Sequence, residues 1–313
     1  MPIRFIRTGL AMLLAATAFQ ASAQDFPNRA ITMVMPYAAG GPGDTITRLF
    51  AGAMQKHLGQ QIVVDNTAGA SGSIGTAKVA RAKADGYTLL MIHVSHATNV
   101  AMYKSLPYHP VDDFEPIGRA TSGPMVIVAR NEFPAKNLNE FVAYVKANGP
   151  KVSLAHAGVG SASHLCGLMM MNALGIKLNE IPYKGTGPAL TDLMGGQVDM
   201  LCDQTTQTIN VVKDNRVKVY GTTTPKRLSA LPNVPTLDQE GLKGFEVKVW
   251  HGLYTPKNVP QAIQTKLNTA LKAALNDPDV KKRLADSNID IVSADKISAN
   301  GLKTHLDNEI NKW

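Results

Sequence analysis

Residues 31–44 read ITMVMPYAAGGPGD and predict a strand, a glycine-rich turn and a helix in immediate succession. The β-branched and long apolar residues at the start favour a short buried strand. A glycine-rich turn between a strand and a helix leaves backbone N–H groups unpaired at the positive end of the helix, where an anion is stabilised. The unit therefore indicates an α/β fold with an anion site at 36–44. The helix that follows carries one apolar face, formed by Ile46, Leu49, Phe50 and Ala53.

The same alternation continues along the chain and predicts two βα units of similar size. Because βαβ order implies parallel strands with right-handed crossovers, each unit is expected to hold a mostly parallel sheet flanked by helices. The predicted strands are 31–35, 61–64, 87–94, 125–129, 152–155, 178–182, 198–202, 217–222 and 247–254. After the first helix, the predicted helices are 73–84, 138–147, 162–173, 188–194, 260–275, 278–286 and 298–311.

The chain length also favours two domains over a single core. We predict that residues 24–122 together with 226–313 form lobe 1 and that residues 123–225 form lobe 2. Lobe 1 is discontinuous because the helical tail returns to it. The hinge is expected at two chain crossings, near 119–124 and near 222–227.

The N-terminus has the pattern of a secretory signal peptide. A basic start with Arg4 and Arg7 precedes an apolar run at 10–19, and a small-x-small pattern ends at Ala23. The run is shorter than the roughly 20 residues that span a bilayer. We therefore predict that residues 1–23 are removed by cleavage after Ala23 and that the mature protein resides in the periplasm.

Charge and cysteine content exclude several classes of function. The formal net charge is +8, but the basic residues are dispersed and no aromatic residues interleave with them, so nucleic acid binding is not expected. The two cysteines, Cys166 and Cys202, fall in lobe 2, and the sequence leaves open whether they form a disulfide or two buried thiols. No histidine or cysteine lies at ligand spacing beside them. We predict no metal and no cofactor.

Two further strand-to-helix turns lie in the second half of the chain, at 158–164 (GVGSASH) and 183–188 (YKGTGP). Glycine-rich turns in both halves are what a protein needs to bind a ligand in a cleft between two lobes. The segment 69–75 (GASGSIG) is either part of the cleft wall or a flexible connector.

Polar residues at two strand ends complete the candidate site. Ser95 and His96 follow the third strand, and Asp203 follows the strand at 198–202, where it either orients a ligand amine or hydroxyl or caps the next helix. The predicted ligand-binding residues are Tyr37, Ala38, Ala39, Gly40, Gly41, Asp44, Ser95, His96, Gly160, Ser161, Ser163, Thr186, Gly187 and Asp203.

Catalysis is not expected. A Ser/His/Asp set can be drawn from Ser161, from His96 or His164, and from Asp203, but the G-x-S-x-G elbow of serine hydrolases is absent. No H-E-x-x-H motif and no paired-carboxylate signature occur either. A hydrolase using Ser161 or Ser163 is the least favoured alternative.

Long stretches of the chain resemble one family, in the same order along nearly the whole mature sequence. They resemble the solute receptors of tripartite tricarboxylate transporters, the Bug or TctC receptors. The stretches include FPNRAITMVMPYAAGGPGD (26–44), LGQQIVVDNTAGASGSIGTAKVARAKADGYTLL (58–90), MYKSLPYHPVDDFEPIG (102–118), IPYKGTGPALTDLMGGQVDMLCDQ (181–204) and WHGLYTP (250–256).

The resemblance implies a type II-like periplasmic-binding-protein fold, with two lobes that close on a ligand in the manner of a Venus flytrap and perform no chemistry. It implies that the turn at 36–44 holds a ligand carboxylate, partly through ordered water, and that lobe 2 contributes 158–163, 184–187 and Asp203. It also implies that the protein, as a monomer, delivers its ligand to integral membrane transporter subunits. A receptor domain that signals to a two-component system is the second alternative.

The ligand itself is predicted only as a class. No arginine falls in the cleft motifs, and Lys184 is the nearest cation, which favours a mono- or dicarboxylate over a densely charged citrate. Tyr37 and His96 are placed to flank a ring. The expected ligand is therefore a small carboxylate, with an aromatic carboxylate or dicarboxylate such as terephthalate as one candidate.

Overall fold

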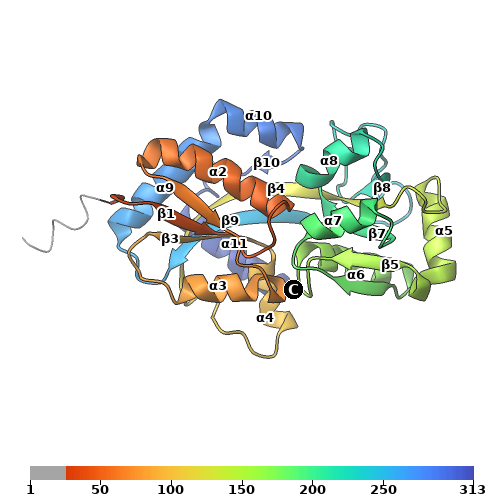
Figure 1. Ribbon diagram of the computed structural model, residues 1–313, viewed down its shortest axis with the longest axis horizontal. Helices are drawn as coiled ribbons and strands as arrows, with labels where there is room; N and C mark the ends of the chain where they lie inside the picture. The colour runs from red at the N-terminus through yellow and green to blue at the C-terminus, as the bar shows by residue number, and fades with distance from the viewer. Residues whose placement is uncertain (1–25) are drawn as a thin grey trace, which may run out of the picture.

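Two lobes lie side by side along the long axis of the molecule (Figure 1). The computed structural model describes residues 26–313, so the predicted signal peptide, 1–23, and its cleavage site lie outside the described residues. Within that described part, no helix has both the length and the apolar character needed to cross a membrane. The strands follow the order β2 (Ile62–Asp65), β1 (Ile31–Val34), β3 (Thr88–His93), β9 (Lys248–Pro256), β4 (Phe114–Ala129), β7 (Met200–Gln204), β5 (Ser153–His156) and β6 (Asn179–Pro182). Strands β8 (Lys218–Thr222) and β10 (Asp290–Ile291) also pair with β4.

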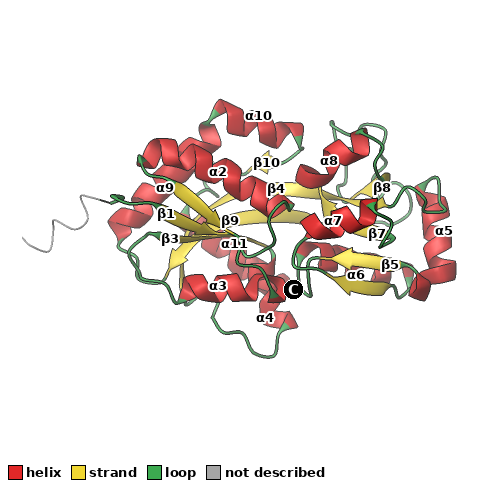
Figure 2. Cartoon of the chain, in the orientation of Figure 1, coloured by secondary structure: helices red, strands yellow, loops and turns green. Residues whose placement is uncertain are grey.

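Lobe 1 is a mixed sheet with helices on both faces (Figure 2). Strand β1 runs parallel to β2 and β3, whereas β9 runs antiparallel to β3 and β4. The strands are β1 (Ile31–Val34), β2 (Ile62–Asp65), β3 (Thr88–His93), β9 (Lys248–Pro256), β10 (Asp290–Ile291) and the first part of β4 (Phe114–Ala129). The helices are α2 (Pro42–Leu58), the short η2 (Ala70–Gly72), α3 (Ser73–Ala80), α4 (Ser95–Met102), α9 (Gln261–Asn276), α10 (Pro278–Asp286) and α11 (Ala299–Lys312).

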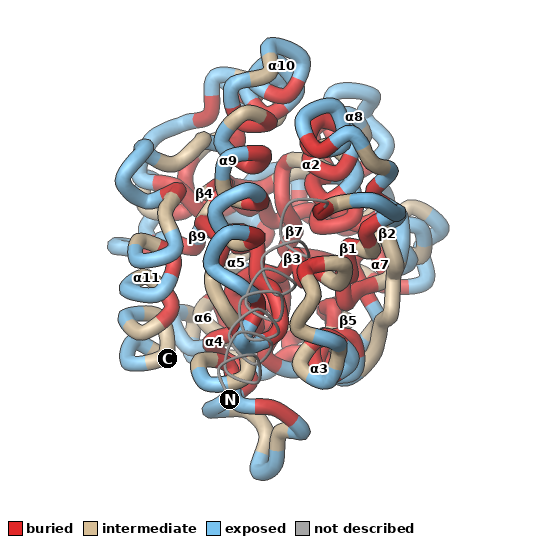
Figure 3. Tube along the Cα trace, turned by 90° about the vertical axis from the view of Figure 1, so that its left-hand side faces the viewer, coloured by how far each residue is buried: buried red, intermediate tan, exposed pale blue. Residues whose placement is uncertain are grey.

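Successive residues of strand β3 pack alternately into two different hydrophobic cores. Leu89 and Met91 of β3 pack in the core that includes α2, α9 and α10, whereas Leu90 and Ile92 pack in the core that includes α3 and α11. This period of two is expected for a strand covered on both faces. The buried strands lie inside a shell of helices with exposed outer sides (Figure 3).

Lobe 2 repeats the βα pattern around a smaller sheet. Strand β5 runs parallel to β6 and β7, and β4 runs antiparallel to β7 and β8. A disulfide joins Cys166 of α6 to Cys202 of β7, which decides between the two states that the sequence left open. The strands are β5 (Ser153–His156), β6 (Asn179–Pro182), β7 (Met200–Gln204) and β8 (Lys218–Thr222). The helices are α5 (Leu138–Asn148), the short η3 (Gly149–Lys151), α6 (Ala162–Leu174), α7 (Thr186–Met194) and α8 (Thr205–Lys213).

The chain passes twice between the lobes. Strand β4 pairs with β9 in lobe 1 up to Pro124 and with β7 and β8 in lobe 2 from Met125 onward. The return crossing lies at Val247, whose N–H donates to the carbonyl of Thr223. Residues between β8 and β9 pack in the core of lobe 2, so the contacts favour a second boundary near residue 247 over the predicted one at 226. The apolar residues that bring them there are Leu228, Leu231 and Val234.

Local sequence explains where helix α2, which forms part of the site, begins and ends. Pro42 is its first residue. Proline is favoured at this position because the backbone N–H that it lacks would not be hydrogen-bonded within the helix there. Gly59 follows its last residue with φ of 69°, a left-handed conformation that favours glycine, and its N–H donates to the carbonyl of Gln55. The helix therefore starts directly after the glycine-rich turn and presents its positive end there.

Candidate ligand-binding site

A small cavity of about 30 Å³ lies between the lobes, so a ligand larger than a water molecule can enter only when the lobes move apart. Its walls come from the turn before α2, the end of β3, the turns before α6 and α7, and the end of β7. Eight of the predicted residues line it: Tyr37, Ala38, Gly41, Asp44, Ser161, Ser163, Thr186 and Asp203. Four more lining residues, Pro42, Gly43, Ala162 and Gly185, belong to the turns predicted to bind the ligand. Sequence reasoning missed five others: Met35, His93, Met125, Ala157 and Gln204.

Four helices begin at this cavity: α2, α6, α7 and α8. The N–H groups in the first turn of a helix have no partner within the helix. Among the described residues, those of Gly43 and Asp44 in α2 and of Ala162 and Ser163 in α6 have no acceptor. No lysine or arginine belongs to the described lining. The cavity therefore offers amide dipoles instead of side-chain cations, an arrangement suited to an anion.

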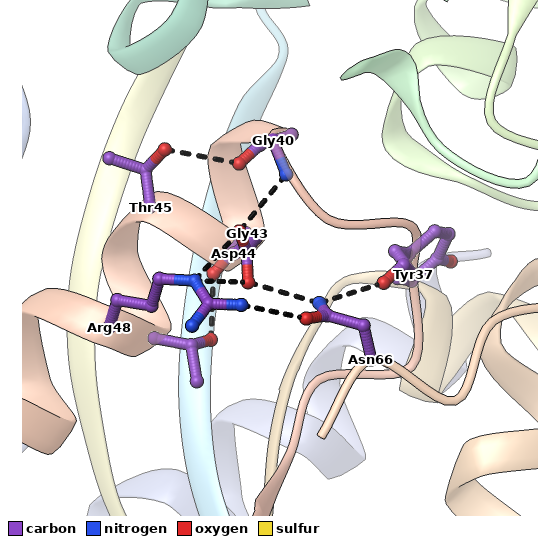
Figure 4. Close-up of polar contacts among 9 residues, drawn as sticks. Tyr37, Gly40, Gly43, Asp44, Thr45, Arg48 and Asn66 are labelled. Atoms are coloured by element: carbon purple, nitrogen blue, oxygen red, sulfur yellow. Dashed lines mark hydrogen bonds and ion pairs between the residues drawn. The ribbon is translucent and has the colours of Figure 1, made fainter. Parts of the chain in front are cut away.

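Asp44 fixes the shape of the first turn (Figure 4). Its carboxylate accepts hydrogen bonds from the N–H of Gly40, the guanidinium of Arg48 and the amide of Asn66, each at 3.0 Å. The amide of Asn66 also donates to the carbonyl of Tyr37 at 3.1 Å. Burial alone would raise the pKa of Asp44, but these three donors outweigh burial and hold it below its ordinary value. Asp44 thus positions the turn and leaves the helix N–H groups for a ligand.

Two hydroxyls play the same positioning role in lobe 2. Ser161 caps α6 by accepting from the N–H of His164 at 3.3 Å, and Ser163 accepts from the N–H of Ala157 at 2.8 Å. The two hydroxyls also share a hydrogen bond of 3.1 Å. Each side chain thereby stabilises the turn while it faces the cavity.

An aromatic pair forms one wall of the cavity. The rings of Tyr37 and His93 lie 4.6 Å apart, and the Tyr37 hydroxyl donates to the carbonyl of Ser71 at 2.9 Å. Burial lowers the pKa of His93 to about 4, so its imidazole is neutral at physiological pH. The wall is therefore uncharged.

The predictions for Ser95 and His96 are corrected by the structure. Strand β3 ends at His93 and the chain turns into α4, so His93, not His96, reaches the cavity. His96 is fully buried in lobe 1, with Nε2 3.0 Å from the carbonyl of Pro110. Its ring packs against Tyr108, Phe114 and Tyr254.

Four other predicted residues, Ala39, Gly40, Gly160 and Gly187, lie outside the cavity lining, at contacts between the lobes. Thr98 of lobe 1 donates to the carbonyl of Gly160 at 2.6 Å. A Cβ at Gly187 would lie 2.9 Å from the carbonyl oxygen of Ala39 and 3.1 Å from the backbone of Gly40. These residues hold the lobes together around the cavity.

The turns of the two lobes also meet through their backbones. The N–H of Ala38 donates to the carbonyl of Lys184 at 3.0 Å. On the other side of the cavity, a Cβ at Gly158 would lie only 2.6 Å from the hydroxyl oxygen of Ser71. The segment 69–75 therefore packs against lobe 2 and is not part of the cavity lining.

Asp203 is the buried acid of the cavity. It ends β7, is 1 % exposed, and its Oδ2 has no hydrogen-bond partner among the described residues. Burial raises the pKa of Asp203 to about 7, although the backbone N–H of Gln204 and the hydroxyl of Thr186 partly offset this effect. The side-chain oxygen of Gln204 is likewise buried without a partner. Two residues of the cavity lining thus carry buried acceptor oxygens without a partner among the described residues.

The described residues contain one cluster with the donor atoms of a metal site: His156, His164 and Glu180. Nδ1 of each histidine accepts a backbone N–H, from Gly158 and Gly160 respectively, at 3.1 Å. Neutral rings therefore carry their proton on Nε2, and Nε2 of His164 lies 3.0 Å from the Glu180 carboxylate. A metal needs a free lone pair at that nitrogen. The cluster acts as a hydrogen-bonded support for the turn at 158–161.

The Ser/His/Asp set drawn from the sequence is not assembled. Ser161 is bonded to the backbone N–H of His164 and to Ser163, while the His164 ring points to Gly160 and Glu180. His96 is fully buried in lobe 1, where it contacts the carbonyl of Pro110. Neither histidine is placed to take a proton from a serine.

Comparison with known proteins agrees with this geometry. A model of the family described as "Tripartite tricarboxylate transporter family receptor" matches residues 46–313. The chain belongs to this family. This match confirms the predicted recognition of the family. Members of the family are binding proteins and not enzymes.

Individual relatives cover nearly the whole chain. The UPF0065 protein in the TAR-I ttuE-ttuC' intergenic region of Agrobacterium vitis is 48% identical over 279 residues, which are 88% of this chain and 81% of the relative. The periplasmic binding protein BugD superposes with a TM-score of 0.90 at 44% identity, covering 92% of this chain and 96% of BugD. MatC from Rhodopseudomonas palustris, with bound malate, has a TM-score of 0.89 at 38% identity, covering 92% and 98%. The predicted periplasmic-binding-protein fold is confirmed.

Proposed function

We propose that the chain captures a small carboxylate in the interlobe cavity and delivers it to the membrane subunits of a tripartite tricarboxylate-type transporter. The observation that carries the proposal is the meeting of four helix N-termini, from both lobes, around one cavity with no lysine or arginine in its described lining. The malate bound in MatC supports the ligand class. We further propose that the protein is exported after cleavage behind Ala23 and acts as a monomer.

The unsatisfied oxygens of Asp203 and Gln204 narrow the choice of ligand. A buried acceptor without a donor costs about 1–3 kcal/mol, so a ligand that brings a hydroxyl or ammonium group gains from meeting them. Terephthalate has carboxylates but no such donor when fully ionised. A hydroxy- or amino-substituted carboxylate therefore fits the cavity better than an aromatic dicarboxylate.

A thermal-shift screen of mono-, di-, tri- and aromatic carboxylates tests the binding step. A true ligand at a concentration of about 100 times its Kd adds roughly 2.7 kcal/mol to the free energy of unfolding, because it binds only the folded state. The melting temperature should then rise by about 5–10 °C, and further with concentration. Equal melting curves across the whole panel would contradict the proposal.

Co-purification tests the delivery step. The tagged receptor, loaded with the ligand found in the screen, should recover the transporter membrane subunits from detergent-solubilised native membranes. Recovery of a sensor histidine kinase instead would favour the sensory alternative.

A further inference from the structure

The charges in the cavity do not balance when a fully ionised dicarboxylate binds. Each helix N-terminus is equivalent to roughly half a positive charge, so the four ends offset about two negative charges. A dicarboxylate supplies both of those charges. The ionised Asp44 of the lining is paired with Arg48 and leaves this balance unchanged. An ionised Asp203, whose Oδ2 has no partner among the described residues, would add a third unpaired negative charge.

Two carboxylates that share a buried site cannot both stay ionised without cost, and the pKa of one of them rises strongly. The ligand carboxylates have the helix N–H groups as partners, whereas Oδ2 of Asp203 has none. A proton placed on this oxygen removes the surplus charge and provides a hydrogen-bond donor that can reach the ligand. Asp203 is therefore the better place for the proton.

We infer that this receptor takes up one proton, held on the Asp203 carboxyl, when it binds a dicarboxylate that has no ammonium group. The inference rests on the proposed function and adds a pH control to it. A ligand with an ammonium group can neutralise Asp203 directly and needs no proton. The affinity for dicarboxylates without an ammonium group should therefore depend on the protonation of Asp203, whereas the affinity for those with one should not require this proton.

The groups that line the cavity with Asp203 do not compete for this proton near neutral pH. Burial raises the pKa of Tyr37 above its ordinary value and lowers that of His93 to about 4, so both are neutral. Asp44 is held ionised by Arg48 and its other donors. Asp203 itself, with a pKa of about 7 before any ligand arrives, is poised to titrate in this range.

The other titratable and charged groups near β7, on or beside the elements packed against it, lie outside the cavity lining. His164 on α6 and His156 on β5 have pKa values lowered by burial. Asp192 on α7 accepts from the Tyr183 hydroxyl, and Arg130, directly after β4, pairs with Asp199. Lys213 on α8 is exposed.

Titration calorimetry in two buffers of different ionisation enthalpy measures the proton count directly. The probes are malate, succinate and glutarate, with aspartate as the dicarboxylate that carries an ammonium group. At pH 8 we expect close to one proton taken up per malate, succinate or glutarate, and close to none at pH 6. The affinity for these probes should fall about 30-fold between pH 6 and pH 8.5, since only the protonated form binds well. Aspartate should show neither effect.

Asp203→Asn imitates the uncharged, protonated acid and should abolish the pH dependence of the affinity. Asp214→Asn, the same change at an exposed acid of lobe 2, should keep the wild-type profile. Wild-type binding of malate, succinate or glutarate without proton uptake at pH 8 would overturn the inference alone, as would an unchanged pH profile in Asp203→Asn. Failure of every dicarboxylate to bind the wild type at any pH would instead overturn the proposed function.

Melting of the unliganded protein gives a second readout. Because burial raises the pKa of Asp203 above its unfolded value, the stability it contributes is present below about pH 4 and is lost as pH rises through 7. Asp203→Asn should therefore melt higher than the wild type at pH 8, and the difference should shrink as pH is lowered toward 4. A difference that does not change with pH would contradict a buried, titrating Asp203.

Discussion

Gly187→Ala is expected to weaken carboxylate binding by about 30- to 150-fold, which corresponds to about 2–3 kcal/mol. The new Cβ would lie 2.9 Å from the carbonyl oxygen of Ala39 and 3.1 Å from the backbone of Gly40 and Gly41. These are backbone atoms that cannot rotate away. The clash exists only while the lobes are in contact, so the variant should fold normally and remain open.

Gly195→Ala is the matched control for this prediction. Gly195 caps the other end of the same helix, α7, and its added Cβ would make only ordinary contacts, at 3.5 Å or more. Calorimetry should show wild-type affinity for the control. Small-angle scattering should show a smaller radius of gyration on ligand addition for the control but not for Gly187→Ala. Wild-type affinity in Gly187→Ala would mean that the lobes do not need this contact to hold a ligand.

Removal of the disulfide is expected to cost about 3–4 kcal/mol of lobe 2 stability. Cys166 and Cys202 are 36 residues apart in sequence, and a crosslink that closes a loop of this length restricts the unfolded chain by about that much. Both sulfur-bearing residues are fully buried, so alanine is the suitable replacement. The melting temperature of Cys166→Ala/Cys202→Ala should fall by roughly 10 °C.

The loss of the disulfide should leave the ligand affinity nearly unchanged at temperatures where lobe 2 is still folded. Cys202 precedes Asp203, so the disulfide ties α6 and its capped N-terminus to the strand that carries the cavity acid. At 10 °C the double variant should bind its ligand with near wild-type affinity, because the lobe is still folded. The wild type treated with a reductant should melt like the variant. An unchanged melting temperature in the variant would show that the disulfide leaves the unfolded chain unrestricted.

The sequence predicted the βα units and the first turn because local pattern and tertiary structure agree there. In residues 31–44 the apolar run, the glycines and Pro42 each favour the same strand, turn and helix. The first half of β4 was missed because its prolines and glycines disfavour a strand. The structure accommodates Pro116 and Gly118 at a register shift, and the long strand is held by its pairing with β9.

Helix α8 was missed for a different reason. Its sequence, TTQTINVVK, is rich in β-branched residues, which have low helix propensity. Burial of Ile209 and Val212 in the core of lobe 2 overrides that propensity. Tertiary contacts of this kind cannot be read from a local pattern.

The candidate site was predicted correctly at the glycine-rich turns as segments and at the end of β7, and wrongly at the end of β3. Asp203 was found because it follows an apolar strand. His93 was missed because the predicted strand ran one residue too far, to 94, and placed His96 at the cavity instead. Since successive strand residues face opposite sides, an error of one residue at a strand end selects the wrong side chain.

A crystal structure of the complex with the carboxylate that gives the largest thermal shift tests the central claim most directly. We expect one ligand carboxylate in the cavity beside Asp203, about 2.7–3.2 Å from N–H groups in the first turn of α2 and of α6 or α7, or joined to them by one ordered water. A ligand bound instead in the open groove between α2, α8 and α10, or held by one lobe alone, would contradict the account.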